Sequence, residues 1–549
     1  MNRFRPVLTI IAGVSAALVA GAPAQSAPPA HRYLVEFAPG KAANGKTAVK
    51  AVGGVVKLDL ARFNAVAAVI PDAKLSVLRS NPAVKLVEPD PVRYPISAVH
   101  SLPSGAERGI NADGAATGEV VPYGITLVQA DQVQGNLSAE AKVCVIDSGY
   151  DIRHEDKPKQ PTVEGTDDPD GAGPWDEDGS GHGTHVSGTI NALDNEIGVI
   201  GVFPNASMHI VRVFGNDGLW AYSSDLINAV GDCMTHGANV INMSLGGELP
   251  SRLENAVFLQ AQKAGVLSIA AAGNGGNGRT CDMWADRPER QACKMHYPSG
   301  YASVMSVAAV DESKRLASFS QINSKVEIAA PGVSVLSTVP TGSMMDVTLT
   351  TGLGTTDVEP MDNFPIPTGP VSGLLQDCGL GATADDCGNA TGKVCLIERG
   401  SVTFAEKAVS CETAGGVAAV VYQKAGEAGP VLGTLGETYV HIPVVGTDRD
   451  TGLALKAGYL DSEAIVTFTV SDYNYDWFSG TSMATPHVAG VATLLKSLHP
   501  TCGPTELRKA MNATALDLGP LGRDKYFGYG LVQAKAADAY LTKNGCTGQ

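Results

Sequence analysis

The chain has 549 residues, of which 44% are hydrophobic and 17% are charged. This length predicts three or four structural units at roughly 100–200 residues each. Forty Lys and Arg against 56 Asp and Glu give a formal net charge of −16, which argues against nucleic acid or an anionic membrane as the main partner. Such a charge suits a soluble extracellular protein that binds calcium.

The first 24 residues have the pattern of an export signal. Arg3 and Arg5 give a positive start, Val7 to Ala22 is almost wholly apolar, and the small residues of Ala22-Pro23-Ala24 resemble a cleavage site. A membrane anchor is the weaker alternative, because the apolar run is shorter than the ~20 residues that a span needs. We therefore expect a secreted, extracellular protein with no membrane contact.

Ten cysteines in an exported chain favour disulfide bonds. The sequence does not fix their connectivity, but local spacing suggests the pairs Cys281–Cys293, Cys378–Cys387, Cys395–Cys411 and Cys502–Cys546. Cys144 lies in an apolar, strand-like run and Cys233 in a helix-like stretch, and we interpret both as buried free thiols. A metal site is the weaker interpretation, since no Cys-x-x-Cys pair occurs.

Residues 31–94 have the pattern of a small α+β domain. Alternating apolar residues and helical spacing predict strands over 32–37 and 63–70, helices over 46–52 and 73–80, and a closing segment over 84–90. Residues 95–118 are rich in Ser, Gly and Ala over most of their length and are interpreted as an exposed linker.

From about residue 119 apolar strand-like runs alternate with helical patterns. Strands are expected at 143–146, 208–213, 240–243, 266–271 and 304–307, and helices at 223–236 and 252–264. This alternation predicts an α/β fold in which a parallel sheet is covered by helices. The pattern stops near Ser343 and resumes at about Tyr475. Residues 344–471, rich in Gly, Thr and Val, therefore form a second domain inserted into the first, which comprises 119–343 and 472–549.

Two motifs in the first part of this core carry candidate catalytic groups. Asp147 ends the buried run Val145-Ile146-Asp147, where parallel sheets place their ligand crevice, although alone it could simply begin a turn. His182 lies in Gly181-His182-Gly183-Thr184-His185, whose small residues allow a helix N-terminus to approach other backbone. His185 is interpreted as a packed structural histidine, because the His-Glu-x-x-His pattern of zinc proteases is absent.

The third motif follows the insertion, in Gly480-Thr481-Ser482-Met483-Ala484-Thr485-Pro486. Ser482 opens an apolar helix that runs to about Leu498. A hydroxyl at this position gains from the positive end of the helix dipole when it becomes an alkoxide-like nucleophile. Pro486 would normally break a helix, so we expect a kink or a proline tolerated in the first turns.

The order Asp, His, Ser is the subtilisin order, and from about residue 121 to 541, apart from the insertion, the chain resembles the subtilases. The resemblance implies a subtilisin-like parallel sheet sandwiched by helices and a serine endopeptidase in which Ser482 attacks, His182 moves the proton and Asp147 fixes the imidazole tautomer. Ala270-Ala271-Ala272-Gly273-Asn274 matches the family's oxyanion segment. Asn274 and the backbone N–H of Ser482 are therefore the expected donors.

Subtilases hold the peptide as an added strand between two edge segments. The matching segments contain the expected substrate-binding residues Gly218, Leu219, Trp220, Ser244, Leu245, Gly246, Ala271, Ala272, Gly273 and His296. Trp220 and His296 replace residues that are often small in the family. We predict a primary pocket that is shallower and more polar than that of subtilisin, although either side chain alone could simply pack against its neighbours.

Leu193-Asp194-Asn195-Glu196-Ile197-Gly198-Val199 resembles the calcium loop of subtilases. The resemblance implies a structural calcium ion held by Glu119, Asp156, Leu193, Asn195, Ile197 and Val199. The alternative is a polar surface loop without an ion.

Residues 31–94 resemble the inhibitor-type propeptide of subtilases, and 344–471 the β-rich protease-associated (PA) domain. We therefore expect self-processing, with a cut between about Pro103 and Glu119, protein and peptide substrates, the propeptide as inhibitor, and a monomer. A binding protein on an inactive scaffold is the least favoured alternative, since all four catalytic residues are present. General proteolysis is favoured over selective processing of the kexin type, because the chain ends soon after Leu531.

Overall fold

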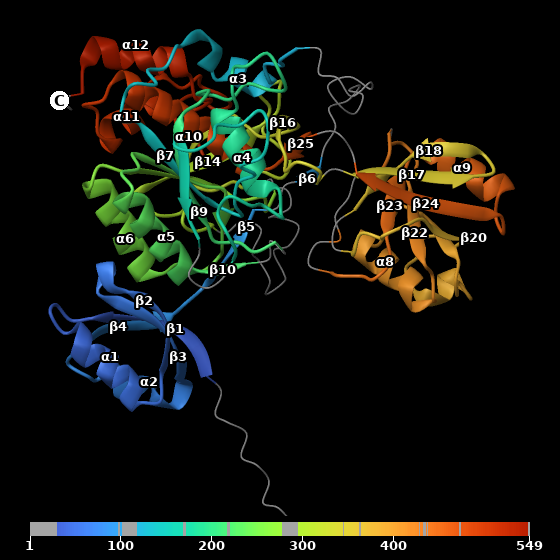
Figure 1. Ribbon diagram of the computed structural model, residues 1–549, viewed down its shortest axis with the longest axis horizontal. Helices are drawn as coiled ribbons and strands as arrows, with labels where there is room; N and C mark the ends of the chain where they lie inside the picture. Colours follow the sequence, from blue (N-terminus) through green and yellow to red (C-terminus); the bar gives the residue numbers. More distant parts are fainter. Residues whose placement is uncertain are drawn as a thin grey trace, which may run out of the picture.

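The computed structural model describes residues 30–96, 99–100, 118–167, 172–216, 220–276, 295–343, 345–361, 364–427, 429–431, 435, 438–470 and 474–546. The expected export signal and the pair Cys281–Cys293 lie outside these ranges. Three units are visible in Figure 1: a central one, a smaller one below it and another at its side. Among the helices of the described ranges, none has the length and apolar character to cross a membrane.

The small N-terminal unit is an antiparallel sheet with two helices on one face. Its strands lie in the order β2-β3-β1-β4. Because side chains alternate along a strand, Tyr33 and Val35 of β1 pack toward the helices, whereas Leu34 joins a cluster with residues of the central unit. Strand β2 was not predicted. The elements are β1 (Ala30–Phe37), α1 (Ala42–Ala51), β2 (Val55–Leu60), β3 (Ala65–Pro71), α2 (Leu75–Arg79) and β4 (Val84–Pro89).

The central unit is built on a seven-stranded sheet in the order β15-β14-β13-β11-β7-β9-β8. Every neighbouring pair is parallel, as the alternation of strands and helices predicts. The sheet confirms the five expected strands and adds β8 and β15. Its strands are β7 (Lys142–Asp147), β8 (Val163–Thr166), β9 (Ser207–Arg212), β11 (Val240–Met243), β13 (Leu267–Ala271), β14 (Val304–Val310) and β15 (Val326–Pro331).

Helices cover both faces of this sheet (Figure 1). Residues of α4 and α10 join one buried cluster and residues of α5 and α6 another, so both faces are removed from water and the strands can be continuously apolar. The helices are α3 (Tyr123–Leu127), α4 (His182–Asn191), α5 (Ser223–Thr235), α6 (Arg252–Lys263), α10 (Thr481–Leu498), α11 (Pro504–Thr514) and α12 (Ala534–Asn544).

The inserted unit has an eight-stranded sheet in the order β18-β17-β24-β20-β21-β22-β23-β19. It contains parallel and antiparallel neighbours and is accompanied by two helices, as expected for a β-rich PA domain. The elements are β17 (Met345–Thr351), β18 (Gly354–Asp357), β19 (Glu359–Pro360), β20 (Val371–Asp377), β21 (Val394–Glu398), α8 (Phe404–Thr413), β22 (Ala418–Tyr422), β23 (Val444–Thr447), α9 (Arg449–Gly458) and β24 (Glu463–Val470).

Four disulfides lie in the described residues, and one corrects the sequence analysis. Cys378–Cys387, Cys395–Cys411 and Cys502–Cys546 are bonded as expected. The prediction of free thiols at Cys144 and Cys233 is wrong: they are bonded, with Cα atoms 5.7 Å apart. Strand β7 carries Cys144 and the helix packed on it, α5, carries Cys233, and this tertiary proximity is invisible in positions 89 residues apart.

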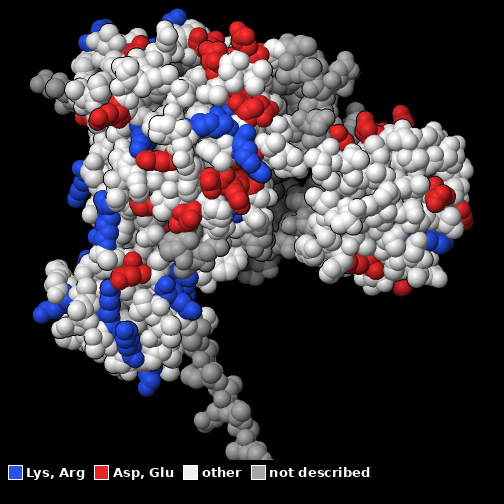
Figure 2. Space-filling model, viewed as in Figure 1, with Lys and Arg blue, Asp and Glu red and all other residues white. Residues whose placement is uncertain are grey.

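The N-terminal unit packs on α5 and α6 of the central unit. Arg62 Nη1 donates to the carbonyl of Gly231 at 2.9 Å, and Arg32 Nη2 lies 3.0 Å from Asp225 Oδ1. Residues 30–96 contain ten Lys and Arg against five Asp and Glu, which leaves 30 against 51 for the rest of the chain. Basic side chains are correspondingly frequent on this unit in Figure 2. Opposite net charges favour its association with the central unit.

Candidate active site

Asp147 and His182 form a buried pair at the carboxyl edge of the sheet. Asp147 is the last residue of β7 and His182 the first of α4. His182 Nδ1 lies 2.7 Å from Asp147 Oδ1, and the two side chains are 7% and 0% exposed. Burial disfavours the imidazolium, but the charge of Asp147 and its hydrogen bond outweigh burial, so the pKa of His182 is raised. The pair is suited to a base that accepts a proton at Nε2.

Asp178 positions the imidazole by holding the start of α4. Its Oδ1 accepts hydrogen bonds from the backbone N–H of Gly181 at 2.9 Å and from Ser148 Oγ at 2.9 Å, and its Oδ2 accepts from Thr184 N at 2.8 Å. The bonds from Gly181 and Thr184 satisfy backbone N–H groups that have no partner within the helix. A Cβ at Gly183 would lie 2.3 Å from the carbonyl oxygen of Gly149, so this close approach requires glycine. The sequence analysis missed Asp178.

Ser482 is the second residue of α10, and Pro486 lies inside the same helix. Proline cannot donate to the carbonyl four residues earlier, which here is the carbonyl of Ser482. Ser244 Oγ donates to that oxygen instead, at 2.7 Å. The proline is therefore tolerated because a side chain from another element replaces the missing backbone donor.

A segment that follows the N-terminal unit crosses Ser482 as an added strand. Strand β5 (Val92–Pro95) lies between β10 (Ala221–Tyr222) and β12 (Leu245–Gly246), antiparallel to both. Ile96 N donates to the carbonyl of Ser244 at 3.2 Å, and Ser482 Oγ donates to the carbonyl of Ile96 at 2.6 Å. The nucleophile candidate therefore contacts a peptide bond of the chain's own N-terminal part.

The hydroxyl of Ser482 points at this carbonyl rather than at the imidazole. Within the described residues, His182 Nε2 is buried without a hydrogen-bond partner. A proton transfer from Ser482 to His182 needs the hydroxyl to turn toward Nε2, and such bonds often tighten only in the reacting complex.

Asn274 is held by Thr481, the residue that precedes Ser482 in the chain. Thr481 N donates to Asn274 Oδ1 at 3.0 Å and Thr481 Oγ1 donates to the same oxygen at 2.9 Å. A backbone N–H can only donate, so the accepting atom is the amide oxygen and the nitrogen is the donating end of the side chain. This orientation suits an oxyanion donor. Thr481, which sets it, was not singled out from the sequence.

The expected primary pocket lies beside Ile96. A Cβ at Gly246 would lie 3.3 Å from Ile96 Cδ1 and 3.4 Å from His296 Nδ1, and a Cβ at Gly273 would lie 2.7 Å from the same nitrogen. His296 thus narrows the space that these glycines leave open. Burial lowers its pKa, and Arg93 lowers it further, which favours a neutral imidazole.

The other expected pocket residues fall into three groups. Ala271 and Ala272 are buried, and Leu245 belongs to β12. Trp220 is 47% exposed, and its ring packs edge-on against Tyr222 with centroids 4.8 Å apart. Gly218 and Leu219 lie outside the described residues.

The expected calcium loop brings its candidate ligands together. Asp156 Oδ2 accepts from Val199 N at 2.8 Å, and Glu119 Oε1 accepts from Asn195 N at 2.8 Å. Asp156 Oδ1 is buried without a hydrogen-bond partner in the described part of the chain. Burial raises the pKa of Asp156 to about 7 and also raises that of Glu119, and a nearby cation would counter both shifts. An all-oxygen set with an unsatisfied carboxylate oxygen fits calcium.

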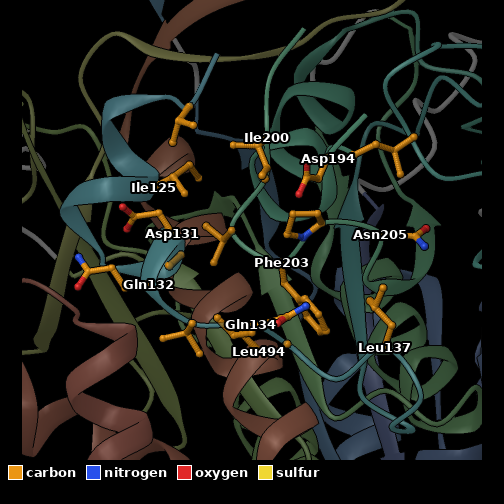
Figure 3. A pocket seen from close by; sticks show the side chains of 18 of the residues that line it. Ile125, Asp131, Gln132, Gln134, Leu137, Asp194, Ile200, Phe203, Asn205 and Leu494 are labelled. Atoms are coloured by element: carbon orange, nitrogen blue, oxygen red, sulfur yellow. The ribbon is translucent and has the colours of Figure 1, made fainter. Parts of the chain in front are cut away.

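A cavity of about 890 Å³ adjoins this loop. Figure 3 shows Asp194, Ile200 and Phe203 along one side of it and Ile125 and Asp131 along the other. Glu119, Leu193 and Asn195 also line the cavity, and neither Asp147, His182 nor Ser482 does. It therefore belongs to the surroundings of the loop and not to the substrate cleft.

A buried Asp–His pair, a serine at a helix start and a peptide strand across that serine define a site of the serine peptidase class. The comparisons with known proteins agree. The model of the Subtilase family matches residues 138–362 and 432–530, and that of the PA domain matches 368–455. The chain belongs to the subtilase family, carries a PA domain and is a subtilisin-type serine endopeptidase.

Several relatives are similar over most of their own length. Subtilisin NAT of Bacillus subtilis subsp. natto is 34% identical over 319 residues, which cover 57% of this chain and 74% of the relative. Subtilisin DY of Bacillus licheniformis is 39% identical over 227 residues, 41% of this chain and 77% of the relative.

Solved structures show the same fold. The subtilisin-like protease Apa1 of the Antarctic psychrotroph Pseudoalteromonas sp. AS-11 is 39% identical, with a TM-score of 0.52, and the match covers 78% of this chain and all of that one. Fervidolysin of Fervidobacterium pennivorans is 23% identical, with a TM-score of 0.56, and the match covers 94% of this chain and 62% of the fervidolysin chain. The latter likeness concerns the fold alone.

Proposed function

We propose that this subtilase is a secreted, broad-specificity endopeptidase with Asp147, His182 and Ser482 as its catalytic triad. The observation that carries the proposal is the contact of Ser482 Oγ with the carbonyl of Ile96, 2.6 Å away, on a strand held between two edges as a substrate would be. Broad specificity follows from affinity supplied by backbone hydrogen bonds, which every peptide offers.

Each residue has a defined role in this proposal. His182 takes the proton of Ser482 as Oγ attacks the carbonyl carbon, and later gives it to the leaving amine. Asp147 stabilises the imidazolium formed in between. The backbone N–H of Ser482 and the amide of Asn274 stabilise the oxyanion. Water then hydrolyses the acyl-enzyme and regenerates Ser482.

The same contact supports self-processing between Ile96 and Ser97. This cut lies within the proposed linker 95–118 but before the 103–119 range that the sequence predicted. Residues 31–94 act in this proposal as the inhibiting propeptide. Their contacts with α5 and α6, and the occupation of the cleft by β5, support that role.

Secretion and a structural calcium ion are two further parts of the proposal. Secretion is supported by the apolar pattern of residues 1–24 and by four disulfides, which form in oxidising compartments. A structural calcium ion is supported by the loop of Leu193, Asn195, Ile197 and Val199 with Glu119 and Asp156. The bound ion would neutralise the two carboxylates.

The test compares the full chain with its Ser482→Ala variant. The wild-type protein should hydrolyse casein, be inactivated by a phosphonyl fluoride, and show a new N-terminus at Ser97. The variant should accumulate at precursor length. A Thr493→Ala variant is the control for a buried hydroxyl lost elsewhere in α10, and it should mature. Efficient maturation of purified Ser482→Ala would refute self-processing, and casein hydrolysis by that variant would refute the proposed nucleophile.

A further inference from the structure

Arg93 lies three residues before Ile96 on the strand that occupies the cleft, and its side chain is fully buried. A lone arginine is rarely buried without a partner, and here the partner is Glu254, which is also 0% exposed. Arg93 Nε donates to Glu254 Oε1 at 3.0 Å and Nη2 donates to Oε2 at 2.5 Å. The two parallel bonds form the bidentate geometry that guanidinium and carboxylate favour.

The acidic side of this pair is built by the central unit alone. Glu254 lies in the first turn of α6, and Tyr301 donates its hydroxyl hydrogen to Glu254 Oε2 at 2.6 Å. Tyr301 is itself fixed, because its hydroxyl oxygen accepts from Ser251 N at 2.8 Å. The pocket would therefore remain after the proposed cut at Ile96 removes the strand that fills it.

Glu254 is not needed to cap its own helix. A glutamate at this helical position usually bonds back to the N-cap N–H, but that N–H belongs to Ser251 and donates to Tyr301 instead. The free N–H groups of Arg252 and Leu253 are satisfied by Glu88 of the N-terminal unit. The carboxylate of Glu254 is thus directed to the cleft and not to the helix.

The strand places its side chains in a regular way. Arg93 is the register partner of Ala221, and Tyr94 that of Gly246. Arg93 and Ile96 are buried, whereas Tyr94 is 41% exposed. Any peptide bound in the same register, with its carbonyl at Ser482, would place the side chain three residues earlier against Glu254.

We propose that Glu254 and Tyr301 form an arginine-selective subsite, so that the mature enzyme prefers substrates with arginine three residues before the residue whose carbonyl is attacked. This inference rests on the proposed function and adds a preference at one position of the substrate to an otherwise broad specificity. Arginine offers a planar fork that matches the carboxylate, whereas lysine offers a single charged point. A neutral side chain leaves Glu254 unpaired in a buried pocket, which is unfavourable.

The experiment measures kcat/KM of the mature enzyme on four fluorogenic peptides of the form X-Tyr-Pro-Ile-Ser-Ala, in which X is arginine, lysine, citrulline or leucine. Citrulline has the shape of arginine without the charge. We expect arginine to exceed citrulline by about 30-fold, since desolvated charge pairs across interfaces have effects of this order, and lysine to lie between them. Glu254→Gln should reduce the arginine-to-citrulline ratio to within about twofold.

Glu327→Gln is the matched control, because Glu327 is a buried carboxylate paired with Arg508 on the other side of the core. It should keep the wild-type ratio. Equal cleavage of arginine and citrulline peptides by the wild-type enzyme would overturn the proposal, and this measurement stands even where Glu254→Gln fails to fold. Failure to hydrolyse casein would instead refute the proposed function. A further outcome would also overturn the proposal: Arg93→Gln matures slowly, but the wild-type mature enzyme shows no preference for the arginine peptide. The Arg93–Glu254 pair would then act only in the precursor.

Discussion

Removal of the Ser244 hydroxyl should destabilise the start of α10. Ser244 Oγ donates to the carbonyl of Ser482, the group that Pro486 leaves without its helical partner. In Ser244→Ala this carbonyl stays buried and loses the hydrogen bond from Ser244, and Pro486 has no N–H to replace it. An unsatisfied buried acceptor costs about 1–3 kcal/mol, so we expect the free energy of unfolding to fall by that amount.

The loss of unfolding free energy caused by Ser244→Ala should depend on Pro486. In a Pro486→Ala background residue 486 regains an N–H, which can donate to the Ser482 carbonyl as in a regular helix. Ser244→Ala should then cost about 1 kcal/mol less than in the native background. The effect of Pro486→Ala on the unfolded chain is common to both members of that background and cancels in the double-mutant cycle.

The measurement is urea unfolding of the four variants, all carrying Ser482→Ala to prevent proteolysis, which leaves the backbone carbonyl in place. Ser337→Ala is the matched control: its hydroxyl donates to the carbonyl of His185 at 2.8 Å, and Thr189 Oγ1 also donates to that oxygen. Its cost should not depend on Pro486. An equal cost of Ser244→Ala in both backgrounds would show that the hydroxyl does not compensate for the proline.

Four further outcomes are expected. Because the pKa of His182 is raised and only the neutral imidazole accepts a proton, kcat/KM should rise with pH with a midpoint above the ordinary 6.5 of histidine; a midpoint below 6 would contradict the pairing with Asp147. Asn274→Ala should lower kcat about 10²–10³-fold, a magnitude taken from the corresponding residue of subtilisin, whereas an unchanged kcat would exclude it as a donor. Replacement of Cys144 and Cys233 by alanine in the Ser482→Ala precursor should cost about 4–5 kcal/mol for their separation of 89 residues, and more than loss of Cys502–Cys546, with its separation of 44, by urea unfolding. EDTA should lower the melting temperature, because a calcium concentration 1,000-fold above Kd contributes about 4 kcal/mol; an unchanged value would count against the ion.

Sequence predicted best what is encoded within short segments. Five of the seven strands of the central sheet, the helix of Ser482 and the candidate residues Asp147 and His182 all belong to runs whose spacing or motif is local. The structure brings Asp147 and His182 into contact as the motif order implies. What remained unpredicted depends on distant partners: Asp178 at the start of α4, the orientation of Asn274 by Thr481, and the bond of Cys144 to Cys233.

The proposed maturation site illustrates why such partners matter. The Ser-, Gly- and Ala-rich stretch favoured a cut after residue 103, because exposed linkers are the usual sites of cleavage. Composition does not report which peptide bond can reach the serine. The register of β5 with β12 does, and it places Ile96 at Ser482. Likewise, Arg93 and Glu254 are ordinary charged residues in the sequence and become a pair only through the added strand.

The inserted domain enters and leaves the core through one pair of adjacent strands. Strand β16 (Val335–Thr338) precedes it and β25 (Tyr475–Ser479) follows it, and Thr338 and Tyr475 are register partners in their antiparallel pairing. A domain whose two ends meet at neighbouring positions can be inserted without separating the strands that carry it. The chain then needs only Gly480 and Thr481 after β25 to reach Ser482. The pairing of β16 with β25 therefore ties the start of α10, which carries Ser482, to a strand that precedes the insertion. Strand β6 (Val99–His100), which follows Ile96 in sequence, also pairs with β25, so the strand that leaves the inserted domain would hold the leaving-group side of the proposed cut after Ile96.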